Sequence, residues 1–350
     1  MGNRRNAMRD LRNETLARFL ASPGRFAVYG AGDTGESVVR ALGECGLKPS
    51  ALLDSYVTGE RLGLAILPPE EALGLDAVVT AGRHARDMTV QLRADGFEGP
   101  VLDLTALHRA PPPAHFDEAR LDAAADAIGF ARSLIEDDGS RAVFDAVLRH
   151  RRSLDPGELP PAPPHPGHPA VPVRDGEWVI DVGSDEAARL ELAEAVGPLG
   201  RVLVLEPSPA RREALAAAAA MSAVGARIAI HALGCGAACL PPDEGDEDAV
   251  AVVTVDEFVW ETTSGRVDRV RFARDGAEAT PSAREVVNGA SATLSEHRPC
   301  LEIDLSGAAD DLWEVPIRLK ERLPSYRVHL AHHSQGLGGT VAYARAPEGP

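Results

Sequence analysis

The chain has 350 residues, of which 44% are hydrophobic and 25% charged, so we expect a globular protein, and its length favours two domains over one. The alternation of predicted strands and helices described below indicates an α/β fold. A formal net charge of −17 disfavours nonspecific binding to nucleic acid, because the phosphates would be repelled. The N-terminus lacks the apolar stretch of a signal peptide and no apolar run reaches the length of a membrane span, so we expect a cytoplasmic protein without membrane association.

The N-terminal part predicts a basic helical arm over residues 1–23, followed by a small Rossmann-type domain over residues 24–110. A strand is predicted over residues 26–29, then a helix that ends near Gly46. Further strands are predicted over residues 51–53, 76–80 and 101–103. Alternating strands and helices of this kind are typical of a parallel sheet.

A glycine-rich turn follows the first of these strands. Gly30, Gly32 and Gly35 form GxGxxG, and Asp54 ends the next strand 19 residues after Gly35. These glycines permit a tight turn and close approach of a phosphate, and the acid has the spacing of a ribose ligand. The four residues are therefore a candidate site for a nucleotide or nucleotide-sugar. The unit is short for a complete NAD domain, so a structural or dimerising role stays open, as does a nucleotide-linked oxidoreductase, although no hydride-transfer constellation is recognisable.

Residues 111–170 are predicted to form a helical and proline-rich connector. Ser140 is the expected cap of a helix that runs to about Leu154. His165 and His168 lie in the proline-rich part, where a surface loop is favoured over a metal site. The four cysteines are scattered, as is typical of reduced thiols, so we expect no bound metal.

The last domain, residues 171–350, begins with a strand–turn–helix–strand unit. The two strands, 178–180 and 202–205, are followed by Asp181 and Glu206, and Gly183 lies in the turn after the first strand. Ligands bind at the carboxyl ends of such strands, and a glycine there lets the backbone pass close to a ligand. The later pattern predicts strands near 226–231, 250–255, 267–273 and 300–305, helices over 282–297 and 317–323, and two final strands. Together these elements predict a second Rossmann-like unit, a seven-stranded methyltransferase sheet with an antiparallel edge.

Several segments of the second half resemble the FkbM family of S-adenosylmethionine-dependent methyltransferases. These are DVGSDEA, VLEPSPARREAL, TVDEFV, VDRVRFARDGAE and DDLWEVP, which occur in that family's order. The resemblance implies O-methylation of a sugar or another small hydroxylated metabolite, with S-adenosylmethionine as cofactor. It also leaves a homo-oligomer open.

The resemblance assigns roles to individual residues. The implied cofactor contacts are Asp181, Gly183, Ser184, Glu206 and Ala232, and the implied catalytic residues at the mouth of the site are Arg271, Asp275 and Glu278. The chain departs from the family at Ala187, where a second glycine is usual, and at Ala273, where an acid is usual. Because these changes affect the cofactor turn and a candidate base, the alternative is a catalytically inactive protein of the same fold that binds a ligand or scaffolds partners.

Overall fold

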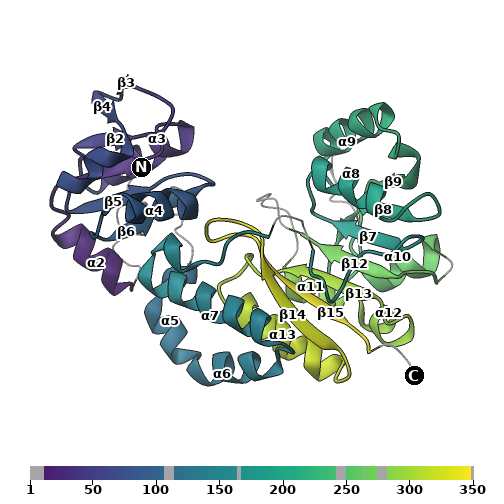
Figure 1. Ribbon diagram of the computed structural model, residues 1–350. Helices are drawn as coiled ribbons and strands as arrows, with labels where there is room; N and C mark the ends of the chain where they lie inside the picture. The colour runs from purple at the N-terminus through teal and green to yellow at the C-terminus, as the bar shows by residue number, and fades with distance from the viewer. Residues whose placement is uncertain are drawn as a thin grey trace. The chain divides into compact units, whose positions relative to one another are not determined.

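The computed structural model describes residues 12–105, 114–163, 167–241, 250–263, 265–273 and 282–347. Two compact units are formed (Figure 1). Unit 1 comprises Met1–Gly129, Arg141–Pro164 and His332–Gly339, and unit 2 comprises Phe130–Ser140, His165–Ala331 and Thr340–Pro350. Both are built on mainly parallel sheets, which confirms the predicted α/β class with two Rossmann-like units. The three boundaries between the four segments predicted from the sequence stay a prediction.

Unit 1 is organised around a six-stranded sheet of order β3-β4-β2-β1-β5-β6, in which only β3 runs antiparallel to its neighbour. In the central strand β1, Phe26 and Val28 enter one apolar cluster with α2 and α3, whereas Ala27 and Tyr29 enter another with α4. Burial of both faces explains why every residue of β1 is apolar. The elements are α2 (Glu14–Ala21), β1 (Phe26–Tyr29), α3 (Asp33–Glu44), β2 (Ala51–Leu53), β3 (Gly59–Arg61), β4 (Leu64–Leu67), β5 (Ala77–Thr80), α4 (Ala85–Ala94) and β6 (Val101–Asp103).

Three helices follow: α5 (Glu118–Ala123), α6 (Ala125–Leu134) and α7 (Asp138–Ser153). The predicted cap of α7 was wrong. Ser140 lies within the helix, and Asp137 precedes it and accepts a hydrogen bond of 2.8 Å from the backbone N–H of Ser140. An aspartate placed immediately before the first turn satisfies an otherwise orphaned donor, which a serine inside the helix cannot do.

Unit 2 contains the seven-stranded sheet β14-β15-β13-β12-β7-β8-β9, with β15 antiparallel to β13 as predicted. Val179, Val202 and Val204 pack against α8 and α9 on one face of this sheet. The elements are β7 (Trp178–Val182), α8 (Glu186–Ala195), β8 (Arg201–Leu205), α9 (Pro209–Met221), β9 (Ile228–His231), β10 (Gly234–Cys235), β11 (Val252–Val253), α10 (Val255–Thr262), β12 (Arg269–Phe272), α11 (Ala283–Asn288), α12 (Ser291–Glu296), β13 (Cys300–Asp304), α13 (Asp311–Arg322), β14 (Arg327–His332) and β15 (Thr340–Arg345).

Helix α13 starts six residues earlier than the sequence predicts. Pro316 lies inside it, although an interior proline removes one helical hydrogen bond and costs about 3 kcal/mol. Leu312, Trp313, Val315 and Leu319 are all buried along this helix. Burial of four apolar side chains, at about 1.5–3 kcal/mol each, outweighs the cost of the interior proline, so the helix continues past Pro316.

Candidate cofactor site

The residues predicted to contact the cofactor lie at one edge of the unit 2 sheet. β7 and β8 pair in parallel with Asp181 opposite Val204, so Asp181 and Glu206 both stand at carboxyl ends of neighbouring strands. Gly183 turns the chain after β7 with φ of +83°, a conformation that favours glycine. Ser184 donates a hydrogen bond of 2.5 Å to Asp181. Ala232 follows β9, whose last residue accepts a hydrogen bond from the backbone of Glu206. The structure therefore brings these five residues to one edge.

Both acids are already paired with an arginine that the sequence did not single out. Arg189 of α8 donates from Nε to Asp181 over 2.9 Å and from Nη2 to Glu206 over 3.1 Å. All three residues are at most 3% exposed. A guanidinium can bridge two carboxylates in this way because its donors form a rigid fork. The pairing neutralises charge that a cationic ligand would otherwise meet.

A second arginine reaches Glu206 from α9. Ser208 caps this helix and Pro209 occupies its first position. Arg211 lies two residues further on, with Nε 3.0 Å from Oε2 of Glu206 and with Nη2 donating to the carbonyl of Ser184 over 2.8 Å. The other oxygen of Glu206 accepts from the backbone N–H of Ser208. Each carboxylate oxygen of Glu206 therefore has at least one donor.

The sequence did contain a signal for these two arginines. Arg189 and Arg211 lie in the first turns of α8 and α9, where the helix dipole favours acids and disfavours cations. An acidic partner nearby would offset this effect, and in each case an acid ends the preceding strand. The identity of the partners depends on the folded geometry.

Arg271 lies between two acids on neighbouring strands. Its Nε is 3.9 Å from Asp181 and 3.6 Å from Glu302 of β13, and Nη1 donates to the carbonyl of Ala188 over 3.5 Å. Arg271, on the central strand β12, thus lies beside Asp181 on one neighbouring strand and Glu302 on the other. The two acids predicted to act with it, Asp275 and Glu278, lie outside the described residues. Of the three predicted catalytic residues, the structure therefore describes Arg271.

A buried arginine connects the chain before β7 to the centre of the sheet. Arg269 of β12 is fully buried, donates to Glu177 over 2.8 Å and to Glu302 over 2.6 Å, and also binds the carbonyl of Pro172 over 2.7 Å. Burial alone would lower the pKa of Arg269, but the hydrogen bond to Glu177 and the charge of Glu302 raise it above the ordinary value. Arg269 therefore stays charged and acts as a structural tie.

The proline-rich context predicted that His168 lies in a surface loop, but in the structure its side chain is packed against other residues. Its ring stacks on that of His329 at 4.9 Å, and His329 Nδ1 lies 2.7 Å from Asp137. Burial opposes ionisation of Asp137, yet the hydrogen bonds from His329 and Ser140 lower its pKa to about 2. Potential ligand atoms of Asp137, His168 and His329 lie within 4.8 Å of one another, a donor set that suits transition metals. One nitrogen of each ring is engaged: Nδ1 of His168 accepts from the Ala170 N–H, and Nδ1 of His329 faces Asp137.

In unit 1, the candidate nucleotide residues form a closed turn. Gly30 has φ of +117°, and Asp54 accepts backbone hydrogen bonds from Ala31, Tyr56 and Val57. Both carboxylate oxygens of Asp54 are therefore occupied by the chain itself. Arg61 of β3, an element that the sequence did not predict, reaches the same turn and donates to the carbonyl of Ala31 over 2.5 Å and to Asp33 over 3.0 Å.

The third glycine of the turn provides a test of its structural role. A Cβ at Gly35 would lie 1.8 Å from the carbonyl oxygen of Gly30, whereas a Cβ at Gly32 would meet nothing within 4 Å. We expect Gly35→Ala to destabilise unit 1 by about 1–3 kcal/mol through overpacking, despite the better helix propensity of alanine. Gly32→Ala, the matched control, meets no clash and should cost no more than about 1 kcal/mol, since Gly32 is the N-cap of α3. Hydrogen exchange of the β1 amides would measure both, and equal protection in the two variants would contradict the expected clash.

Comparison with known proteins tests the predicted fold. No family model and no curated protein matches the sequence. The crystal structure of the methyltransferase FkbM from Methylobacillus flagellatus matches 98% of this chain and 93% of its own, with a TM-score of 0.67 and 18% sequence identity. The chain has the fold of that methyltransferase. The expected likeness to the FkbM methyltransferases is thereby confirmed for the fold.

Further solved methyltransferases match part of the chain. The O-methyltransferase TomG from Streptomyces achromogenes and a SAM-dependent methyltransferase from Aquifex aeolicus each match 63% of it, at 14% and 15% identity. They are covered over 96% and 98% of their own lengths, with TM-scores of 0.34 and 0.33. Among the described residues, no helix has both the length and the apolar character needed to cross a bilayer.

Proposed function

We propose that unit 2 binds S-adenosylmethionine at the carboxyl ends of β7 and β8 and transfers its methyl group to a hydroxyl of a small, sugar-like metabolite. The observation that carries this proposal is the joint placement of Asp181, Gly183 and Glu206 at one sheet edge. The fold shared with a structure described as the methyltransferase FkbM supports it.

Each residue has a definite task in this chemistry. The ribose hydroxyls of the donor would donate to Glu206, the bend at Gly183 would leave room for the backbone to approach the donor, and Asp181 would face its methionine portion. The acceptor oxygen forms a bond to the methyl carbon as the carbon–sulfur bond breaks in line. The hydroxyl proton passes to a base, for which Asp275 is our candidate and Glu278 the alternative.

Titration of purified protein with S-adenosylmethionine in a calorimeter tests this function. We expect saturable binding by the wild type and a loss of about 100-fold in affinity for Glu206→Gln, because a carboxylate that accepts two hydroxyls is replaced by an amide with a single acceptor. Glu213→Gln is the matched control, since Glu213 is exposed on α9, and it should bind as the wild type does. Equal affinity in all three proteins would contradict the assigned role of Glu206.

The alternative is a catalytically inactive protein of methyltransferase fold that binds another ligand or scaffolds partners. One observation favours it, namely that Arg189 already neutralises both candidate cofactor acids. The same calorimetry separates the two functions, since an absence of heat at millimolar donor supports the inactive protein. A nucleotide or nucleotide-sugar in unit 1 stays a prediction from the GxGxxG spacing, in a turn where Asp54 accepts backbone hydrogen bonds from Ala31 and Tyr56.

A further inference from the structure

Arg211 lies across the proposed donor site, between the turn after β7 and the acid after β8. It is rooted on α9, and its guanidinium contacts both the turn after β7, at the carbonyl of Ser184, and the acid after β8, at Glu206. A ribose placed between that turn and that acid would need the same carboxylate oxygen. Arg211 and the donor therefore compete for Glu206.

The two arginines on Glu206 differ in their freedom to leave. The side chain of Arg189 is 1% exposed and bridges two buried acids, so its release would strand both charges away from water. The side chain of Arg211 is 24% exposed, so its guanidinium can move into solvent and be hydrated there. Only Arg211 can give way to a ligand without disrupting the interior.

The charge balance of the proposed donor site changes when Arg211 moves away from Glu206. The linked ion pairs contain four acids (Asp181, Glu206, Glu302 and Glu177) and four arginines (Arg189, Arg271, Arg211 and Arg269), so their charges balance. With Arg211 displaced, one net negative charge remains, which matches the single positive charge of a sulfonium. After methyl transfer the sulfur is neutral, so the charge attraction that opposes the return of Arg211 is lost.

We propose that Arg211 is a latch, which the donor displaces from Glu206 on binding and which closes again as the demethylated product leaves. Arg189 stays in place as the permanent counter-ion of Asp181 and Glu206. The latch weakens the hold on the demethylated product and so assists its release. This inference rests on the proposed function, because it takes the donor to be the ligand that binds at Glu206.

Calorimetry with S-adenosylmethionine and its demethylated product, S-adenosylhomocysteine, tests the latch. Removal of the competing side chain in Arg211→Ala should tighten the binding of both ligands by about tenfold. Arg201→Ala removes the same charge at the other end of β8, where Arg201 is exposed and donates to the carbonyl of Gly200, and its affinities should equal those of the wild type. Arg211→Gln, which keeps part of the side chain, should lie between the wild type and Arg211→Ala.

The outcomes separate the latch from the proposed function. If the wild type binds the donor and Arg211→Ala binds it equally or more weakly, the latch is wrong while the function stands, since Arg211 would then support the donor. If neither protein binds donor at millimolar concentration, although tryptophan fluorescence reports a folded unit 2, both proposals fail. Tightening in Arg201→Ala to the same extent would also overturn the latch, because general charge would explain the effect.

Discussion

Arg269→Met is expected to lower the free energy of unfolding of unit 2 by about 3–5 kcal/mol, the usual result of removing one partner from a buried charge pair. Arg269 is fully buried, and its loss would leave Glu177 and Glu302 in the interior without their main cation. It would also leave the carbonyl of Pro172 without that donor. The loss therefore combines unpaired charge with an unsatisfied backbone group.

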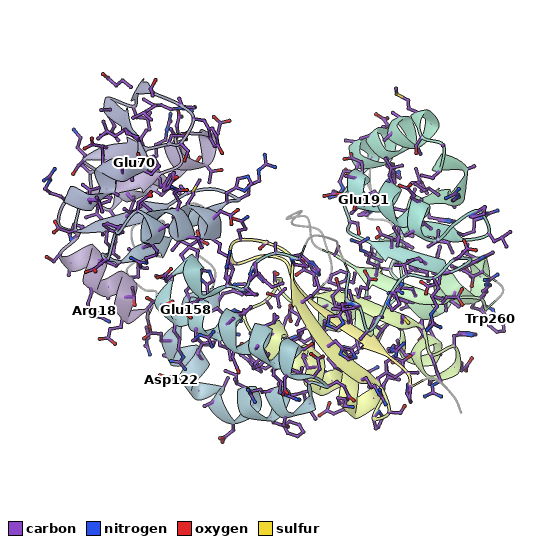
Figure 2. All side chains as sticks on the ribbon, viewed as in Figure 1. Arg18, Glu70, Asp122, Glu158, Glu191 and Trp260 are labelled. Atoms are coloured by element: carbon purple, nitrogen blue, oxygen red, sulfur yellow. The ribbon has the colours of Figure 1, made fainter. Side chains whose placement is uncertain are left out.

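Urea unfolding followed by tryptophan fluorescence measures this effect selectively. The three tryptophans, Trp178, Trp260 and Trp313, all belong to unit 2. Trp313 is buried, whereas Trp260 projects into solvent from α10 (Figure 2). Trp313 should thus report loss of the core, and Trp260 should contribute a nearly constant signal.

Arg266→Met provides the matched control for Arg269→Met. Arg266 also pairs with an acid, but its side chain is 55% exposed, and it lies over the ring of Trp178 at 5.2 Å. We expect a loss of no more than about 1 kcal/mol for such a pair. A further variant that combines Arg269→Met with Glu302→Gln should recover part of the loss, because one stranded charge is removed. Equal losses for Arg269→Met and Arg266→Met would show that burial does not set the contribution.

Most parallel strands of both units were predictable because each is a short apolar run with a polar residue or turn at its end. Asp181 and Glu206 could likewise be placed at one sheet edge, since carboxyl ends of neighbouring parallel strands meet there. The strands β3 and β4 were missed, and β3 in particular is largely exposed, so it lacks the apolar run that marked the others. Local pattern therefore predicts buried strands far better than exposed ones.

The partners of the arginines could not be predicted. Arg189, Arg211 and Arg269 are three among many arginines, and each ion pair joins residues that only the folded sheet brings together. Asp181 and Glu206 were interpreted as ligands for a cofactor, and the structure adds internal cations for both. The catalytic roles of Asp275 and Glu278 stay predictions from the resemblance alone.

Arg189→Met should destabilise unit 2 by about 3–5 kcal/mol, as expected for a buried cation that pairs with two buried acids. Arg189→Lys should lie in between, because a single ammonium keeps the charge but cannot form the fork that reaches both carboxylates. The same urea titration measures both variants. Arg227→Met is the control, since Arg227 donates to the neutral carbonyl of Ala193 near the end of α8, and it should cost less than about 1 kcal/mol.

The decisive comparison is between the two arginines that share Glu206. Arg211→Met should cost less than about 1 kcal/mol, because its partner keeps Arg189 and its own side chain is partly hydrated already. A large loss from Arg189→Met with a small loss from Arg211→Met would establish one fixed and one removable cation on the same carboxylate. Large losses of unfolding free energy from both variants would mean that Glu206 cannot be released to a ribose. The carboxyl ends of β7 and β8 would then form a structural core rather than a donor site.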